Sequence, residues 1–230
     1  MVKKKIDNEK EFWDKKIINW EDGRYFNKNN FFFEKISDFF SYSLHFRRQK
    51  SYEFLKKVGC KNKIICELGC GSGFLAKKII KMGAKNYLGI DISSEAINRA
   101  KIINKKLINK NKCFFYCGRI ENFRFYKKVD IFFSLGFIDW ISDKELKYMK
   151  NIIGFDKIFF HSFSLLKKNN IIQFLHKAYV YFSYKRKKKL SPIYRSKNNI
   201  IKIYKNHSKL FFYSHKKLSF GCFFGNINFE

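Results

Sequence analysis

The chain has 230 residues, of which 49 are Lys or Arg and 19 are Asp or Glu, so its formal net charge is +30. Hydrophobic residues make up 46% and aromatic residues 20%, which is ample for a buried core and excludes a chain that is disordered throughout. Phe, Lys and Tyr are abundant and Pro occurs once, a bias that A+T-rich codon usage produces. Much of the charge therefore needs no functional explanation, although a basic surface still attracts phosphates and anionic membranes.

The cysteines and the apolar segments indicate a cellular compartment. Six cysteines lie in apolar runs without the paired spacing of a zinc site, so we expect buried thiols in a reducing compartment and no metal site. The first 16 residues are charged and lack the apolar stretch of a signal peptide, and no run of 18 uncharged apolar residues occurs. The sequence therefore predicts a cytoplasmic protein.

Helical and strand-like patterns alternate along most of the chain. Residues 1–58 carry apolar side chains at helical spacing and are expected to form a helical cap segment, followed by a core of residues 59–230. Helical periodicity returns after residue 73 as far as Gly83, and again from a cap at Ser93 or Ser94 to about residue 107. The expected strands cover residues 64–68, 86–90, 113–117, 129–134 and 157–163. This alternation predicts an α/β fold with a mostly parallel, doubly wound sheet and a ligand at the carboxyl ends of its strands.

The tail departs from this alternation. Residues 209–214 and 218–224 are strand-like runs separated by a short polar turn, which predicts a hairpin added antiparallel to the sheet. Residues of about 165–208 are too many for a plain connection between the fifth strand and the hairpin. We expect them to be an insertion that builds a site.

A glycine-rich segment directly after the first strand carries the chemistry. It reads Glu67-Leu68-Gly69-Cys70-Gly71-Ser72-Gly73, and its residues 69–73 are called the glycine loop below. Glycines at alternate positions let the backbone approach a ligand closely, and the helix that follows offers free N–H groups. Asp91 ends the second strand, where a carboxylate can bind a ribose diol. Glu67 would repel a pyrophosphate but can hold the cationic amino-acid end of a ligand, so a nucleoside-bearing cofactor of that kind is favoured.

These residues resemble the class I S-adenosylmethionine-dependent methyltransferases over residues of about 45 to 165. The resemblance implies a Rossmann-like sheet of seven strands that ends in an antiparallel hairpin. It also implies that the methionine half of the cofactor S-adenosylmethionine is cradled by Glu67, Gly69, Cys70, Gly71 and Gly73. Asp91 matches the acid that binds the ribose hydroxyls, and Ile92 would pack on the adenine.

Two further segments match the family in order and approximate spacing. The turn after the third strand reads Gly118-Arg119-Ile120-Glu121, in which Arg119 replaces the usual acid. The resemblance implies that the Ile120 N–H and Glu121 reach the adenine edge. After the fourth strand, it implies that Ser134 and Leu135 line the cofactor pocket.

The acceptor is less sharply indicated than the cofactor. Methyl transfer is an in-line displacement, and a hydroxyl acceptor also needs a base. Asp139 after the fourth strand and His161 at the fifth are the candidate catalytic residues. Simpler interpretations exist for both residues. Asp139 could cap the next helix, and His161 could be a hydrogen-bonded residue packed under the insertion.

The segment after the fourth strand disfavours some acceptors. Amino-methylating nucleic-acid enzymes that resemble this family carry a double proline there, whereas Pro192 is the only proline of this chain. The similarity to small-molecule O-methyltransferases favours a small-molecule acceptor that is methylated at a hydroxyl oxygen.

Other interpretations stay open. An aromatic-rich stripe over residues 171–182 is followed by five basic residues at 185–189, which is compatible with core packing and with peripheral membrane contact through 171–189. A methyltransferase recruited to RNA or to a membrane by the basic surface is the main alternative. An NAD-binding oxidoreductase is a weaker one, because Gly71, Gly73 and Ala76 also match the dinucleotide pattern. A cofactor-binding protein without catalysis is weaker still, and the sequence does not specify the oligomeric state.

Overall fold

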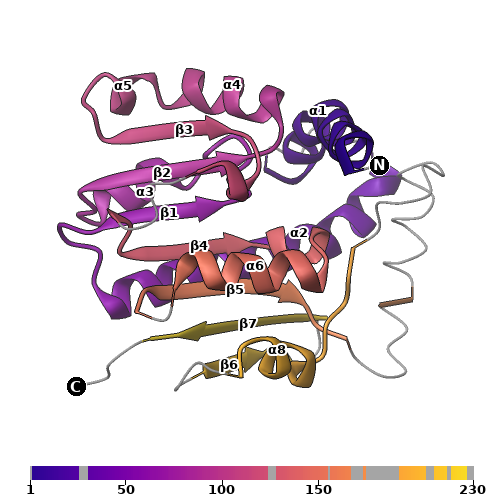
Figure 1. The fold of residues 1–230 in the computed structure, drawn as a ribbon. Coiled ribbons are helices and arrows are strands. Elements are labelled where there is room, and N and C mark those ends of the chain that lie inside the picture. The colour runs from indigo at the N-terminus through magenta and orange to yellow at the C-terminus, as the bar shows by residue number, and fades with distance from the viewer. Residues whose placement is uncertain are drawn as a thin grey trace. The chain divides into compact units, whose positions relative to one another are not determined.

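The computed structural model describes most of the chain (Figure 1). The described residues are 2–25, 31–123, 128–154, 156–166, 173–174, 192–205, 210–216 and 219–226, and their side chains are described except at 2–7, 20, 23–25 and 31–43. They form two compact units, Met1–Phe133 and Ser134–Glu230. The expected division between residues 58 and 59 stays a prediction.

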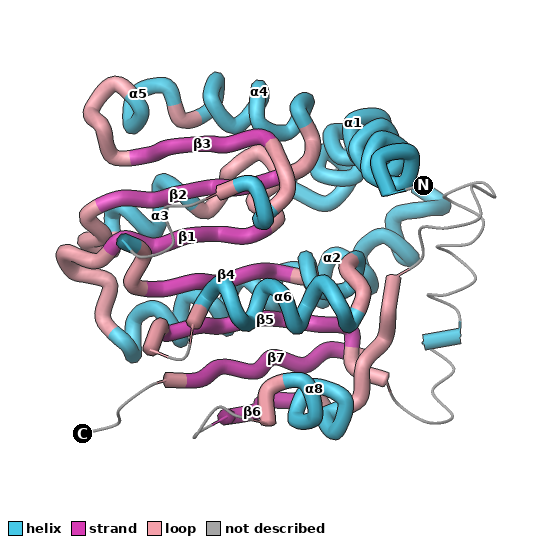
Figure 2. Tube along the Cα trace, viewed as in Figure 1, coloured by secondary structure: helices cyan, strands magenta, loops and turns pink. Residues whose placement is uncertain are grey.

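Seven strands form one sheet, and each begins and ends within two residues of its expected position (Figures 1 and 2). The strands are β1 (Ile64–Leu68), β2 (Asn86–Asp91), β3 (Cys113–Cys117), β4 (Ile131–Leu135), β5 (Ile158–Ser164), β6 (Leu210–Ser214) and β7 (Phe220–Gly225). Their order is β3-β2-β1-β4-β5-β7-β6. β1 pairs in parallel with β2 and β4, β2 pairs in parallel with β3, and β7 pairs antiparallel with β5 and β6. The predicted fold class, including the antiparallel terminal hairpin, is confirmed.

In the first unit, two long helices precede the sheet. α1 spans Val2–Tyr25 and α2 spans Phe31–Val58, so the described part of residues 1–58 is helical as expected. Three shorter helices connect the parallel strands: α3 (Ala76–Lys81), α4 (Ser94–Ile103) and α5 (Lys105–Ile108). α1 packs on α2 and α4, and α4 packs on β2 and β3. The N-terminus of α4 is capped by Ser93, whose side chain accepts a hydrogen bond from Ala96 N–H at 3.1 Å.

In the second unit, helices follow the strand ends. The 3-10 helix η3 (Phe137–Trp140) and then α6 (Asp143–Ile153) come after β4, and α8 (Lys197–Ile203) precedes β6. α6 and α8 each begin with a capping box, formed by Ser142 with Glu145 and by Ser196 with Asn199. These reciprocal hydrogen bonds satisfy N–H groups that a helix start otherwise leaves without partners.

Only part of the expected insertion lies among the described residues. The apolar stripe over 171–182 and the basic run 185–189 fall outside them, except for residues 173 and 174. Gln173 is buried and donates to the Leu165 carbonyl oxygen at 2.9 Å, while Phe174 is 69% exposed. An amphipathic helix in this region, and its contact with a membrane, stay predictions. Within the described part of the chain, no helix combines the length and the apolar character needed to cross a bilayer.

Candidate cofactor site

The glycine loop joins β1 to α3 at the carboxyl edge of the parallel strands. The N–H groups of Gly69 and Cys70 both donate to the carbonyl oxygen of Ile90 in β2, at 2.8 and 3.1 Å. Gly71 and Gly73 have φ values of 51° and 65°, in the left-handed region that favours glycine. The alternate glycines therefore fold the backbone into a tight turn that is tied to the neighbouring strand.

Asp91, the last residue of β2, faces this loop. One carboxylate oxygen accepts from Gly71 N–H at 2.8 Å and the other accepts from Ser93 N–H at 2.9 Å. Burial raises the pKa of Asp91, against the lowering effect of these backbone hydrogen bonds. A carboxylate has about four acceptor sites, and the backbone N–H groups of Gly71, Ser93 and Ile92 occupy three of them, so acceptor capacity remains for a ribose hydroxyl. The residues present therefore fit the nucleoside end of a cofactor.

Glu67, the penultimate residue of β1 before the loop, is buried and accepts a hydrogen bond from the Tyr87 hydroxyl. Burial raises the pKa of Glu67 to about 8, and the nearby charge of Asp91 adds to this effect. A buried carboxyl group with a raised pKa is suited to a cationic ligand, because the arrival of positive charge would favour its charged form. This environment fits the amino-acid end of the expected cofactor.

The turn after β3 lies at the third predicted position. Ile120 and Glu121 belong to the 3-10 helix η1 (Ile120–Asn122), with Ile120 buried and Glu121 partly exposed. Arg119 forms an ion pair with Glu9 of α1 at 2.7 Å and a longer one with Glu121 at 3.4 Å. The arginine that departs from the family pattern is thus balanced by an acid from the N-terminal helix. Ile92 is half-buried at the end of β2, and cofactor contacts of these residues stay predictions.

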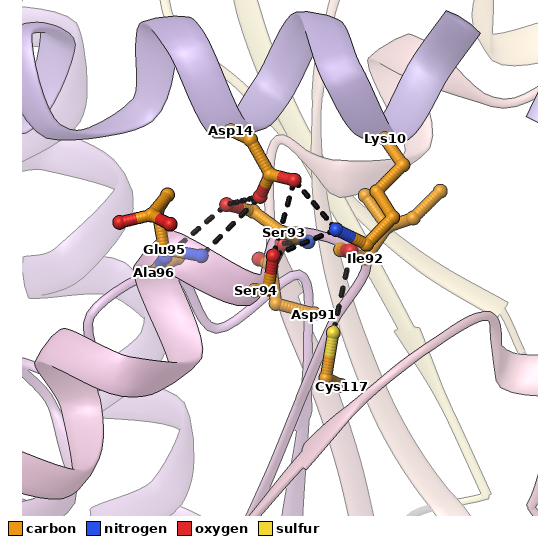
Figure 3. Close-up of polar contacts among 9 residues, drawn as sticks. All are labelled: Lys10, Asp14, Asp91, Ile92, Ser93, Ser94, Glu95, Ala96 and Cys117. Atoms are coloured by element: carbon orange, nitrogen blue, oxygen red, sulfur yellow. Dashed lines mark hydrogen bonds and ion pairs between the residues drawn. The ribbon is translucent and has the colours of Figure 1, made fainter. Parts of the chain in front are cut away.

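α1 brings acidic residues to this edge of the sheet that the sequence alone did not indicate (Figure 3). Asp14 accepts hydrogen bonds from the Ser93 hydroxyl at 2.8 Å, the Ser94 hydroxyl at 3.1 Å and Glu95 N–H at 3.2 Å, and it pairs with Lys10 at 2.6 Å. The Asp14 carboxylate therefore lies at the N-terminal, positive end of α4, in the turn that follows Asp91.

A second acid of α1 reaches the glycine loop itself. Glu21 is 3% exposed, accepts from Ser72 N–H at 2.8 Å and accepts from the Ser72 hydroxyl. Burial raises the pKa of Glu21 to about 7. Asp14 and Glu21 are seven residues apart, which is two helical turns. This spacing places both acids on one face of the helix and is the sequence signal that could have indicated them.

In the second unit, the two candidate bases are buried. Asp139 lies in η3, and its carboxylate accepts from Ser164 N–H at 2.7 Å and from the Ser164 hydroxyl at 2.8 Å. The alternative interpretation of Asp139 as the cap of the next helix is wrong, because Ser142 caps α6. The catalytic role of Asp139 stays a prediction.

His161 lies in the middle of β5 and is fully buried. Its Nδ1 is 2.9 Å from the hydroxyl of Ser134, and its ring lies 5.4 Å from the ring of Phe223 and 5.6 Å from that of Phe159. Burial lowers the pKa of His161 to about 3, so the ring is neutral at physiological pH. Ser134 is buried and Leu135 is half-buried at the end of β4. The catalytic role of His161 and the cofactor contacts of Ser134 and Leu135 also stay predictions.

Comparison with known proteins agrees with this geometry. A family described as "Methyltransferase domain" matches residues 60–210, more than half of the chain. The chain therefore belongs to the class I S-adenosylmethionine-dependent methyltransferases. As an enzyme of this family it uses S-adenosylmethionine as its cofactor, and the nicotinamide alternative finds no support.

Curated relatives of this methyltransferase match over part of their length. A ribosomal protein L11 methyltransferase of Hamiltonella defensa is 45% identical over 49 residues, 21% of this chain and 16% of that protein. A putative protein N5-glutamine methyltransferase of Methanocaldococcus jannaschii is 30% identical over 131 residues, 53% of this chain and 65% of that protein. The chain thus spans less than a fifth of the first relative and about two thirds of the second.

Among solved structures, the methyltransferase is similar to the magnesium protoporphyrin IX methyltransferase of Synechocystis PCC 6803 with bound SAH. The TM-score is 0.71 at 15% identity, over 94% of this chain and 96% of that chain. A methyltransferase from Mesorhizobium loti has a TM-score of 0.54 at 10% identity, over 72% and 91% of the two chains. At such identities the likeness establishes the fold.

Proposed function

We propose that this methyltransferase transfers the methyl group of S-adenosylmethionine to a hydroxyl oxygen of a small molecule. The observation that carries the cofactor half is the pairing of the glycine loop with Asp91, because Gly71 N–H fixes one carboxylate oxygen at 2.8 Å and the carboxylate keeps acceptor capacity for a ribose hydroxyl. When bound, the cofactor would supply an electrophilic methyl group. Glu67, Asp91 and the loop would hold its two ends.

Three observations support a small-molecule acceptor. The similar structure that covers almost the whole chain is named for a small-molecule substrate, magnesium protoporphyrin IX. The relatives named for protein substrates match over shorter segments. The residues Ser134-Leu135-Gly136-Phe137 at the exit of β4 also contain no proline, unlike enzymes that stack a planar amine there. A cytoplasmic location stays a prediction from the sequence.

Binding calorimetry with S-adenosylmethionine and S-adenosylhomocysteine tests the cofactor assignment. We expect Asp91→Ala to raise the dissociation constant of both ligands at least about tenfold, because the hydrogen bonding of the ribose to a charged group is lost. Asp130→Asn is a matched control: Asp130 also accepts a backbone N–H, from Ile64 at 2.7 Å, but at the opposite end of β1. Unchanged affinity in Asp91→Ala, or equal losses in both variants, would contradict the assignment.

The acceptor is tested by methyl transfer from labelled cofactor. The labelled methyl group should pass to a small-molecule fraction that carries hydroxyl groups. The bond that holds it should resist cleavage by mild base, as that of a methyl ether does. Asp139→Asn and His161→Gln test the proposed bases through the pH dependence of kcat, with melting curves as a check on folding. Label recovered only in protein or RNA would refute the small-molecule proposal.

A basic groove favours RNA as the second candidate substrate. It has a volume of about 1150 Å³ and is lined by residues of α2, of the turn before β1 and of α3, including His45, Arg48, Lys56, Lys61 and Lys78. Retention on RNA should then fall steeply with salt, and Lys61→Glu with Lys78→Glu should reduce it. Binding that is insensitive to both would exclude this groove as the RNA site.

A further inference from the structure

Three acids of α1 each contact a different turn at the carboxyl edge of the parallel strands. Glu9 pairs with Arg119 after β3, Asp14 binds the turn after β2, and Glu21 binds the glycine loop after β1. These are the turns to which we assign cofactor binding. α1 is therefore placed to respond to what binds there, and Figure 3 shows how its Asp14 meets the start of α4.

Glu21 makes the closest approach to the loop backbone. A Cβ built on Gly71 would lie 2.3 Å from Glu21 Oε1, so a side chain at residue 71 and this carboxylate exclude each other. Ser72 donates both its N–H and its hydroxyl to the two carboxylate oxygens. Each oxygen thus has one donor from Ser72 and keeps acceptor capacity. The carboxylate is fixed in place rather than free to swing into solvent.

The charges around Glu21 are unbalanced. Arg99 of α4 faces it at 3.8 Å but is bound more closely by Asp22, at 2.5 Å. Asp91 from β2 and Glu67 from β1 lie near enough to repel it. Burial together with this repulsion raises the pKa values of Glu21 to about 7 and of Glu67 to about 8. A ligand that brings positive charge to this loop relieves the repulsion, and a neutral ligand does not.

We propose that Glu21 is a specificity-determining residue that favours the cationic methyl donor over its uncharged thioether product at the glycine loop. The proposal rests on the assignment of this loop to the methionine half of the cofactor. S-adenosylmethionine carries a sulfonium charge that S-adenosylhomocysteine lacks, whereas the two ligands share their ammonium, carboxylate, ribose and adenine. A buried carboxylate therefore discriminates between them by charge, and it promotes exchange of product for fresh donor.

Calorimetric titration of both ligands at pH 8 tests this role in the full chain. Glu21→Gln removes the charge and keeps one acceptor oxygen for Ser72 N–H, while the Ser72 hydroxyl can accept from the new amide group. We expect the dissociation constant of S-adenosylmethionine to rise about tenfold, which corresponds to about 1.4 kcal/mol, and that of S-adenosylhomocysteine to change less than about twofold. Asp130→Asn is the control, since it removes the same charge at the opposite end of β1, where Asp130 accepts from Ile64 N–H at 2.7 Å, and it should leave the preference intact.

The wild-type chain gives a second readout. Its preference for the donor should weaken from pH 8 to pH 6, as Glu21 takes up a proton, and Glu21→Gln should remove that part of the pH dependence. Glu67, Asp91, Arg99 and Asp22 face the same region, and the difference between wild type and Glu21→Gln isolates the contribution of Glu21. An unchanged pH dependence of the preference in the variant would count against the proposal.

Two outcomes would overturn the role proposed for Glu21, and a third would overturn the cofactor assignment on which it rests. An equal loss of affinity for both ligands in Glu21→Gln would show that Glu21 only docks α1. Tighter binding of both ligands would show that its carboxylate blocks the loop. Failure of wild-type protein to bind either ligand would instead refute the cofactor assignment.

Discussion

The close packing around Gly73 of the glycine loop gives a prediction about stability that does not involve a ligand. A Cβ at this position would lie 2.5 Å from Cε1 and 2.8 Å from Cζ of Phe115, and 3.2 Å from Nδ2 of Asn104. The Phe115 ring is buried, and Asn104 is held by its own hydrogen bonds to Gly73 and Ala100. Gly73→Ala must therefore move a packed ring as well as place alanine at a positive φ.

These two costs can be separated within the same chain. Gly59 has a φ of 70°, close to the 65° of Gly73, and a Cβ built on Gly59 would meet no atom of the described residues within 4 Å. Gly59→Ala should therefore cost about 1–2 kcal/mol, the penalty of the left-handed conformation. Gly73→Ala should cost about 2–5 kcal/mol, because forcing a methyl group into packed surroundings adds about 1–3 kcal/mol.

Thermal and urea unfolding of the two variants measure this difference. For a chain of this length, each kcal/mol lowers the melting temperature by about 2–4 °C. Adding Phe115→Leu should recover part of the loss in Gly73→Ala and none in Gly59→Ala, because it removes the ring that the methyl group meets. A loss in Gly73→Ala no larger than in Gly59→Ala would refute the close packing of Phe115 on the loop.

Three further predictions concern buried polar groups. The folded pKa of Glu67 is raised to about 8, so its contribution to stability is full at low pH and is lost as pH rises from about 5 to 8. Glu67→Gln should therefore flatten the fall in melting temperature across that range. Tyr87→Phe, which removes the hydrogen bond to Glu67 but keeps its carboxyl group, is the comparison. Because the folded pKa of His161 is lowered to about 3, its contribution is full above about pH 6.5 and is lost on acidification; in His161→Gln, chemical unfolding at pH 7 and pH 4 should differ less than in wild type. Arg195 donates to the carbonyl oxygens of Ile138 and Ile141 and to Asp143, and a lysine side chain cannot reach all three acceptors. Arg195→Lys should therefore lower the free energy of unfolding by about 2–4 kcal/mol in urea titrations. A smaller loss than in an exposed Lys→Ala variant would contradict a stabilising role of these three hydrogen bonds.

The strands and the loop could be predicted because their signals are local. β-branched and aromatic runs mark β1 to β5, and glycine is favoured where the backbone after a strand takes positive φ, as at Gly71 and Gly73. Asp91 could be placed because parallel strands end at the same edge of a sheet. These inferences need no knowledge of which distant segments meet.

The contacts of the buried polar residues could not be predicted in the same way. Asp139 has the short spacing to α6 that suits a helix cap, yet it binds Ser164, which is 25 residues away. His161 occupies the middle of a strand, where its pattern does not distinguish a core position from a functional one. Arg195 lies in the expected insertion, and its burial beside η3 depends on a contact across more than fifty residues. Such pairings are set by tertiary packing and leave no periodicity in the sequence.

A long-range contact of α1 changes how Arg119, the residue that departs from the family pattern, is interpreted. Taken alone, Arg119 places a positive charge where the family has an acid, which favours the alternative of a cofactor-binding protein without catalysis. The structure sets Glu9 against Arg119 at 2.7 Å and partly buries both side chains. The pair is neutral as a unit, so the turn after β3 does not present an unbalanced cation to a ligand. Since Glu9, Asp14 and Glu21 belong to one helix, loss of α1 should remove the Arg119 partner and the acid at the glycine loop together, so we expect deletion of the helix to weaken cofactor binding.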